Sequence, residues 1–312
     1  MAVLSPADFD RTFGAGGALA AAVHDFFRQG GTVALVSGDL DSLSRAGAIF
    51  SLLVVPGDPA PEVTAAAVAL AEELGAICIL DPPAAWSTAA QAAAGAGSRA
   101  FPRSRNTVVY FPRIAEPGPR RGPAGAVAGV MARSDVVRGV WAAPAGVDAV
   151  LRGVTALDQQ LGDADSALLS PLGVNCLRSF AGASPVIWGA RTTDTTDPEW
   201  RYVNVRRIAL FLERSIAQGS QWAAFEPNGE PLWARLRTEV GAFLEDLFRC
   251  EAFAGNTARD AYFVKCDRDT TTQTDLDNGT VNVLVGFAPL RPAEFVVVKI
   301  GLTTARDTTT SR

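Results

Sequence analysis

Four aspartates in the first half of the chain lie where they could bind a metal ion. Each follows a short apolar run, and they are Asp39, Asp41, Asp58 and Asp81. In an open parallel sheet, ligands bind beyond the carboxyl ends of the strands, and carboxylate oxygens are suitable ligands for Mg²⁺. Aspartates at such positions also form turns and cap helices. A metal-dependent α/β hydrolase with a carboxylate cluster at the strand ends is therefore one hypothesis, and turn formation is the other.

Other kinds of catalytic site have few residues to draw on. His24 is the single histidine, so a Ser-His-Asp or Cys-His arrangement could form only around it. The sequence has no GxxxxGK[ST] loop, which excludes a P-loop NTPase. The four cysteines have no CxxC spacing and indicate buried free thiols of a cytoplasmic protein. They are Cys78, Cys176, Cys250 and Cys266.

The elements that must position these residues alternate in the first half of the chain. Apolar runs predict strands at 32–36, 52–55, 77–80 and 108–111. Helical periodicity or composition predicts helices at 18–29, from Pro61 up to Gly75, and near 126–132. Continuous apolar strands with helices between them predict an α/β fold. Its sheet is expected to be parallel or mixed, with flanking helices on both faces.

The second half predicts an α+β arrangement. A helix is expected over 202–218, and a second one begins at Pro231. The residues expected to face inward from the first helix are Val205, Ile208, Phe211, Leu212 and Ile216. Strands are expected at 222–225, 262–265, 281–287 and 295–300, with a hydrophilic loop over 270–279. We predict one domain over 1–165, a second over 166–300 and a disordered tail over 301–312.

Composition restricts the kinds of partner. With 312 residues, of which 48% are apolar and 20% charged, the chain can bury a sizeable core. A net charge of −5 argues against nucleic acid, because phosphate contacts need a basic face. No segment approaches the ~20 apolar residues that span a bilayer, and the N-terminus does not read as a signal peptide. We expect no membrane insertion by this chain.

An apolar, strand-prone run ends the chain before its polar tail: Phe295, Val296, Val297, Val298, Lys299 and Ile300. Such a terminal strand can complete its own sheet or pair with an exposed edge on another copy. The run alone leaves these two outcomes open.

Short motifs in one order resemble a known family. Trp188, Gly189 and Arg191 lie in WGART, Arg206 and Arg207 end YVNVRR, Glu226 and Asn228 lie in FEPN, and Trp233 follows. GVN at 173–175 precedes them, and FDRTFG at 9–14, GPAGAVAG at 122–129 and RGVWAAPAG at 138–146 extend the match upstream. Together they resemble contractile tail sheath proteins, as in myophages, R-type tailocins and extracellular contractile injection systems.

The resemblance implies a structural subunit. Sheath proteins polymerise around an inner tube and contract, without nucleotide, to drive the tube through a target envelope. It implies no enzyme activity and no cofactor. The implied partners are other sheath subunits (the same or a related chain), the inner tube protein, and baseplate and tail terminator proteins. The particle is expected to assemble in the bacterial cytoplasm as a phage tail-like particle that can be released from the cell.

The resemblance also implies where subunits join. Neighbours in this family are tied by exchanged terminal strands, and we predict that Phe295 to Ile300 is the donated strand. Its predicted recipient edge is formed by Val281, Val283 and Val285 of a C-terminal assembly module, and the predicted tube contact is the helix region Trp233 to Phe248. Family members usually carry an extended N-terminal arm, whereas Met1 to Asp8 precede FDRTFG here. The resemblance thus leaves open whether both halves of the exchange are present.

Overall fold

The computed structural model describes residues 1–45, 47, 49–180, 182–290 and 296–303. The chain forms two compact units, Met1–Arg207 and Ile208–Arg312, and helix α8 (Val203–Gly219) crosses the boundary. The predicted boundary between residues 165 and 166 differs from this division. The reason is that two strands beyond residue 166 join the sheet of the first unit, so that a cut at 165 would split one sheet.

A five-stranded mixed sheet forms the centre of the first unit, in the order β3-β4-β5-β8-β9. Its strands are β3 (Leu52–Val55), β4 (Ile77–Leu80), β5 (Thr107–Phe111), β8 (Val174–Arg178) and β9 (Val186–Trp188). The first four are parallel, and β9 runs antiparallel to β8. All residues of β4 and β5 are buried. The prediction of a parallel or mixed sheet with covered faces is thus confirmed.

Helices cover both faces of this sheet. On one face, α4 (Pro61–Glu73), α5 (Ala89–Gly97) and α7 (Asp163–Leu169) contribute to a core with the strands. On the other face lies α6 (Ala124–Arg138), with α2 (Gly17–Gln29) packed against it. Close approach of these two helices requires glycine, because a Cβ at Gly125 or Gly129 would lie 2.3 Å from a backbone oxygen of α2. This explains the small residues of the GPAGAVAG segment.

The N-terminal segment forms a separate small sheet. The two residues of β2 (Ala34–Leu35) pair antiparallel with β1 (Ala2–Val3), and α1 (Pro6–Phe13) follows β1. The prediction of a strand over 32–36 in the parallel sheet was therefore wrong in extent and in partner. The apolar run pairs with the chain start instead, and the amide N–H of Val36 donates to Met1 O at 2.8 Å. Helix α3 (Leu40–Arg45) comes next.

Smaller elements complete the first unit. Strand β6 (Ile114–Glu116) pairs with β7 (Ala156–Leu157), and the short 3₁₀ helix η1 (Ser170–Leu172) leads into β8. Segments 190–192 and 200–203 then pair: the N–H of Val203 donates to Ala190 O, and that of Thr192 to Arg201 O, both at 2.9 Å. Residues between β9 and α8 are thereby held to the first unit.

The second unit contains an antiparallel sheet in the order β10-β11-β12. Its strands are β10 (Tyr262–Lys265), β11 (Thr280–Phe287) and β12 (Val296–Thr303), and its helices besides α8 are α9 (Glu230–Arg249), α10 (Ala258–Ala261) and α11 (Gln273–Asp277). Two predictions were wrong in detail. The expected strand at 222–225 is a 3₁₀ helix, η2 (Gln221–Phe225), whose backbone bonds close locally from Ala223 N to Ser220 O. The expected loop at 270–279 contains α11, capped by Thr272 and Asp275.

The amphipathic reading of the two long helices holds at most positions. Val205, Ile208, Leu212 and Ile216 are buried, whereas Phe211 is 37% exposed and its ring packs at a tilt against that of Phe243 on α9. Within the described residues, no helix combines the length and apolar character needed to cross a membrane.

Candidate assembly site

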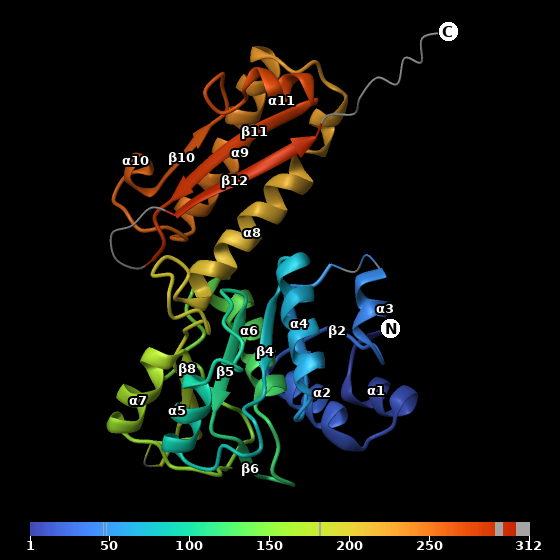
Figure 1. Cartoon of the computed structure of the whole chain (residues 1–312), viewed down its shortest axis with the longest axis vertical. Coiled ribbons are helices and arrows are strands. Elements are labelled where there is room, and N and C mark those ends of the chain that lie inside the picture. Colours follow the sequence, from blue (N-terminus) through green and yellow to red (C-terminus); the bar gives the residue numbers. More distant parts are fainter. Residues whose placement is uncertain (46, 48, 181, 291–295, 304–312) are drawn as a thin grey trace. The chain divides into compact units, whose positions relative to one another are not determined.

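Strand β12 contains most of the predicted donated strand and pairs with β11 of the same chain. The Cα register sets Val281 opposite Leu302, Val283 opposite Ile300 and Val285 opposite Val298. The structure therefore brings the predicted strand and the predicted recipient edge together within one subunit (Figure 1). Phe295 lies outside the described residues. Gly301 to Thr303, predicted to belong to a disordered tail, extend β12, and 304–312 lie outside the described residues.

The β11 strand is shaped to be the centre of a sheet. Val281, Val283, Val285 and Phe287 are all fully buried. Phe263 on β10 is the cross-strand partner of Gly286, and a Cβ at Gly286 would lie 2.1 Å from its ring. The ring can therefore lie over this position of β11 only because residue 286 is glycine. A central strand whose residues are this buried needs a partner on each side, because unpaired buried backbone groups are costly.

Two residues of the matched motifs join the start of α9 to the start of β11. Asn228 Nδ2 donates to Thr280 O at 2.9 Å, and Trp233 Nε1 donates to Asn228 Oδ1 at 2.9 Å. Trp233 is buried. Glu226 lies two residues before this joint, and its exposed carboxylate makes no hydrogen bond or ion pair with the described residues. Asn228 and Trp233 thus hold the start of α9 to the start of β11, while the Glu226 carboxylate has no partner among the described residues.

Motif residues of the first unit surround Asn175 on β8. Its Nδ2 donates to Val109 O at 3.1 Å and to Arg191 O at 2.8 Å, and its Oδ1 accepts from Arg191 N at 2.7 Å. A Cβ at Gly189 would lie 2.8 Å from that same Oδ1, so the position requires glycine. Trp188 stacks edge-on against Phe180, with a ring separation of 5.0 Å. The GVN and WGART motifs are therefore hydrogen-bonded to each other and form one structural joint, centred on Asn175.

The two arginines that end YVNVRR are both buried and both bonded within the first unit. Arg206 Nε donates to Asn106 Oδ1 at 2.7 Å, and its guanidinium lies 4.9 Å from the Trp200 ring centre. Arg207 forms a two-pronged ion pair with Asp135, at 2.8 and 2.5 Å. Two parallel N–H···O bonds fix orientation as well as charge, so these arginines anchor the start of α8.

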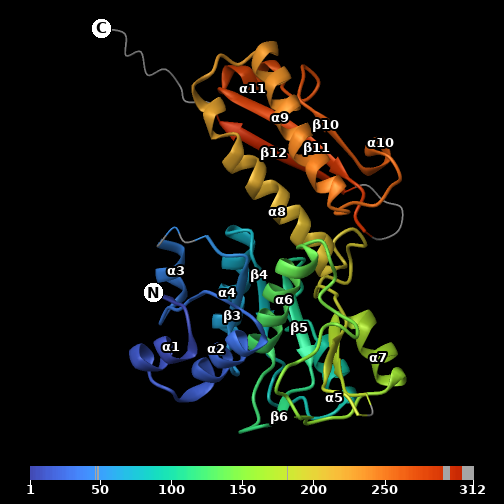
Figure 2. The ribbon, with the colours of Figure 1, turned by 180° about the vertical axis from the view of Figure 1, so that it is seen from behind.

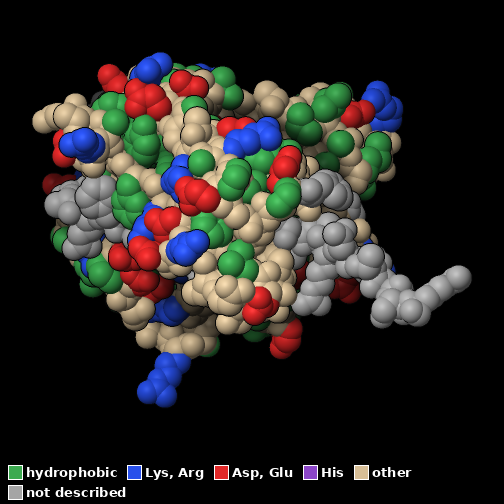
Figure 3. Space-filling view, turned by 90° about the horizontal axis from the view of Figure 1, so that it is seen from above, with side chains coloured by type: hydrophobic (Ala, Val, Ile, Leu, Met, Phe, Trp, Pro, Cys, Tyr) green, Lys and Arg blue, Asp and Glu red, His purple; other side chains and the backbone are tan. Residues whose placement is uncertain are grey.

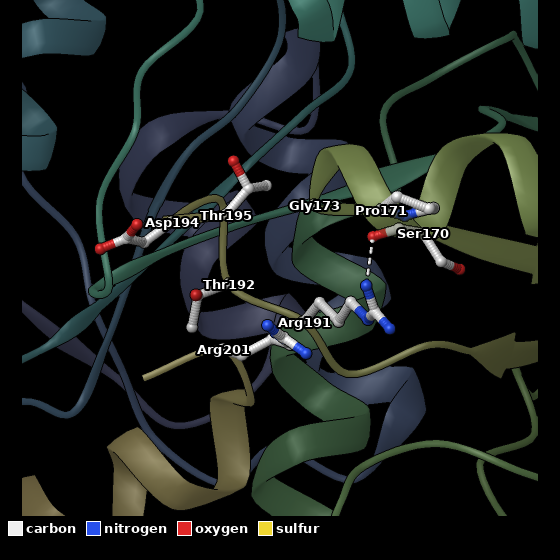
Figure 4. A pocket seen from close by; sticks show the side chains of 8 residues that line it. All are labelled: Ser170, Pro171, Gly173, Arg191, Thr192, Asp194, Thr195 and Arg201. Carbon is white, nitrogen blue, oxygen red and sulfur yellow. Dashed lines mark hydrogen bonds between the residues drawn. The ribbon is translucent and has the colours of Figure 1, made fainter. Parts of the chain in front are cut away.

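A shallow pocket of about 230 Å³ opens beside the WGART segment (Figure 4). Its lining residues are Ser170, Pro171, Gly173, Arg191, Thr192, Asp194, Thr195 and Arg201. Arg191 Nη1 donates to Ser170 O at 3.0 Å. Gly173 has a φ of +78°, and a Cβ there would lie 2.7 Å from Thr192 O. The motif match singled out Arg191 but not Arg201, since Arg201 comes to the pocket only through the pairing of 190–192 with 200–203.

The four aspartates of the metal hypothesis act separately. Asp39 Oδ1 accepts from Ser42 N at 2.6 Å and caps α3, and Asp58 Oδ2 accepts from Ala84 N at 3.2 Å. Asp81 accepts from Gly57 N and from Ala124 N, both at 2.8 Å, and so joins β3 to the start of α6. Asp41 lies in the first turn of α3. Among the described residues, no three His, Cys, Asp or Glu side chains gather as a metal site, and the hydrolase hypothesis has no support.

The thiols and the histidine have ordinary environments. Cys78, Cys176 and Cys266 are buried and Cys250 is exposed, so the prediction of buried thiols was wrong for Cys250. Burial raises the pKa of Cys78 to about 12 and that of Cys266 to about 11. His24 Nε2 lies 2.7 Å from Asp10 Oδ1 and links α2 to α1.

Helix α9, which contains the predicted tube contact Trp233 to Phe248, carries charges of both signs in ion pairs. Arg235 Nε lies 2.9 Å from Glu239 Oε1, and Arg249 Nε lies 3.1 Å from Glu245 Oε1. On the face of the molecule shown in Figure 3, acidic and basic side chains are likewise interspersed. Neither surface resembles the extended basic area that binds nucleic acid.

Comparison with known proteins gives matches over both units. Residues 34–193 match the phage tail sheath protein central domain, and residues 195–303 match the phage tail sheath C-terminal domain. A protein of Pseudomonas aeruginosa named as a prophage major tail sheath protein is 30% identical over 264 residues, which is 82% of this chain and 65% of the relative. The chain spans 19% to 65% of the length of the curated relatives that it matches.

Solved structures match nearly the whole chain. A chain of the PVC sheath complex, an extracellular contractile injection system in the contracted state, has a TM-score of 0.80 and 28% identity, with 99% of this chain and 86% of that chain covered. A chain of the anti-feeding prophage baseplate has a TM-score of 0.78 and 29% identity, with 99% and 88% covered. The motifs, the fold and these matches agree, and the chain belongs to the phage tail sheath family.

Proposed function

We propose that this chain is a structural subunit of a contractile tail sheath, which polymerises around an inner tube and contracts to drive it through a target envelope. The observation that carries the proposal is the match to a chain of a contracted sheath complex over 99% of this chain. In this proposal the chain is not an enzyme and needs no cofactor. Asp39 serves as a helix cap and Asp135 as an ion-pair partner, and contraction draws on subunit repacking rather than on nucleotide.

We propose further that β12 is the strand by which subunits are linked. Eight residue pairs join β11 to β12, and a strand from a neighbouring copy can form the same backbone bonds in the same register. With each bond worth about 0.5–1.5 kcal/mol net, the whole ladder is worth on the order of several kcal/mol. Such a link is strong enough, when repeated around rings, to persist while weaker side-chain interfaces rearrange.

The remaining partners follow from the same proposal. Sheath subunits of the same or a related chain exchange β12 and so complete the β10-β11-β12 sheet. The exposed face of α9 within Trp233 to Phe248 contacts the inner tube. Baseplate and tail terminator proteins bind the two ends of the sheath. The balanced ion pairs on α9 support a contact that is reversible, because exposed ion pairs are each worth about 1 kcal/mol or less. Assembly takes place in the bacterial cytoplasm, before release of the particle.

A deletion experiment tests both parts of the proposal. The full chain is produced together with an inner tube protein, and negative-stain microscopy is expected to show striated tubes. Removal of 292–312 takes away β12 and is expected to block assembly, whereas removal of 304–312 alone leaves β12 in place and serves as the matched control. Absence of tubes with the full chain would contradict the sheath function. Normal tubes after removal of 292–312 would contradict the linking role of β12.

The state of the deleted chain decides how β12 works. Circular dichroism and hydrogen exchange of the β11 amides report whether the second unit stays folded without it. A folded monomer that no longer assembles supports a strand that can be exchanged. Unfolding of the second unit shows instead that β12 belongs permanently to its own core, where it covers the buried Val281, Val283 and Val285.

A further inference from the structure

We infer that the pocket beside the WGART segment binds a carboxylate, and that Glu226 of a neighbouring copy supplies it. The inference deepens the proposed function and depends on it for the partner, because neighbouring copies meet only in an assembly. It rests on the positive charge of the pocket, on its size and on the unpaired carboxylate of Glu226. None of the contacts described above occupies the pocket or pairs this carboxylate.

Two guanidinium groups supply the charge of the pocket. Both Arg191 and Arg201 line it and both are half-buried (Figure 4). Arg191 uses one N–H on Ser170 O at 3.0 Å, which leaves most of its five donors free. The side chain of Arg201 makes no hydrogen bond or ion pair with the described residues. Two like charges that share one partly dry pocket are stabilised by an anion that accepts from both.

Asp194 also lines the pocket, and its carboxylate already accepts hydrogen bonds from Thr196 and Asp197. Partial burial acts to raise the pKa of its carboxyl, but hydrogen bonds from the Thr196 hydroxyl and from the N–H groups of Thr196 and Asp197 outweigh burial and lower the pKa. The Thr196 hydroxyl lies 2.7 Å from Asp194 Oδ1. The carboxyl is therefore ionised, and it points away from the two guanidinium groups (Figure 4).

Size and charge favour a carboxylate over a phosphate. Two arginines and one ionised aspartate give the lining a formal charge of +1, which matches one carboxylate and leaves a dianionic phosphate in excess. The cavity of about 230 Å³ is smaller than the ~300–1,000 Å³ typical of small-molecule sites. It can therefore take the end of one side chain. A planar guanidinium also matches the two oxygens of a carboxylate.

Glu226 has the properties of the missing partner. It is exposed and unpaired, and it belongs to a matched motif of the second unit. Its backbone is fixed on both sides: its N–H donates to Ala223 O at 3.2 Å, and Asn228, two residues on, is bonded to Thr280 and Trp233. Pro227 restricts the chain between them. A carboxylate on such a rigid loop loses little freedom when it binds, which favours its use as a contact.

A charge-swap experiment tests the contact in the assembly. Arg201→Glu and Glu226→Arg are each made in the full chain and produced with the tube protein. Each is expected to raise the protein concentration needed for assembly at least about tenfold, because each places like charges opposite one another. The double variant is expected to recover assembly. Arg99→Glu, an exposed arginine without a side-chain partner among the described residues, is the control for net charge and is expected to assemble normally.

The outcomes separate this inference from the proposed function. Normal assembly of Arg201→Glu, or a double variant as impaired as the single ones, overturns the Glu226 contact while the sheath function stands. Absence of tubes with the unaltered chain contradicts the sheath function. In that case a second measurement, which needs no assembly, decides whether the pocket binds a carboxylate.

This measurement titrates the full chain, labelled with ¹⁵N-arginine, with a C-terminally amidated peptide of residues 222–229, in which Glu226 is the single carboxylate. The Nε–H resonances of Arg191 and Arg201 are expected to shift, and the same peptide with Glu226→Gln is expected to leave them in place. Equal shifts with both peptides overturn the assignment to Glu226, and no shift with either overturns the pocket as a carboxylate site. Larger shifts with inorganic phosphate at equal concentration show a phosphate site and overturn the choice of a protein partner.

Discussion

Replacement of Asn175 is the most direct test of the joint between the GVN and WGART motifs. This side chain is almost fully buried on β8 and carries three hydrogen bonds to backbone groups of β5 and of the segment after β9. Asn175→Ala removes all three at once. It leaves Val109 O, Arg191 O and Arg191 N without their partner.

The expected loss follows from the burial of each bond. An unsatisfied buried group costs about 1–3 kcal/mol. The bond to Val109 is buried, and the two to Arg191 are partly buried. We assign about 2 kcal/mol to the first and about 1 kcal/mol to each of the others, or about 4 kcal/mol in the free energy of unfolding of the first unit. Such a loss is a large part of the ~5–15 kcal/mol that stabilises a domain.

Hydrogen exchange with mass spectrometry measures this loss for each unit. A decrease of about 4 kcal/mol corresponds to about a thousandfold loss of protection for amides of β5 and β8, and β11 in the second unit serves as an internal reference. The control is Asn256→Ala, at an exposed position with no side-chain bond among the described residues, which is expected to change stability by about 0.5 kcal/mol or less.

Asn175→Asp adds a dependence on pH. It keeps an oxygen for Arg191 N but sets a carboxylate against two carbonyl oxygens, and burial raises the pKa of such a group. The folded variant then binds more protons than the unfolded chain, so its stability rises as pH falls through the raised pKa. A loss below about 1 kcal/mol for Asn175→Ala, or equal losses for Asn175→Ala and Asn256→Ala, would refute this account of the joint.

Two further predictions use matched positions in the chain. With a thiol reagent at neutral pH, we expect Cys250 to react rapidly, while Cys78, Cys176 and Cys266 react only on unfolding; a second fast thiol in the native protein would contradict their burial. Trp233→Phe removes the bond from Trp233 Nε1 to Asn228 and is expected to cost the second unit about 1–2 kcal/mol. Trp222→Phe is the control, since Trp222 Nε1 has no partner among the described residues, and equal losses in urea unfolding would show that the bond is not what matters.

Sequence patterns predicted those helices and strands in which buried residues recur at a regular spacing. Strands β3, β4 and β5 and helices α2, α4, α8 and α9 follow from apolar runs and helical periodicity, because one-sided or complete burial leaves a regular trace in the residues. The ordered motifs likewise indicated the family. The run at 222–225 was mistaken for a strand because four apolar residues suit a strand and a 3₁₀ turn equally, and local backbone bonds decided between them.

The sequence by itself determined the class of fold, the lack of a P-loop and the resemblance to tail sheath proteins, since each depends on residue types in chain order. Only the tertiary structure decided which groups meet. It assigned Asp39, Asp58 and Asp81 to separate backbone partners instead of one metal site. It also extended the first unit past residue 165, because β8 and β9 complete its sheet. It also brought Arg201 to the pocket of Arg191, through the backbone pairing of residues 190–192 with 200–203, which no residue pattern in the sequence indicated.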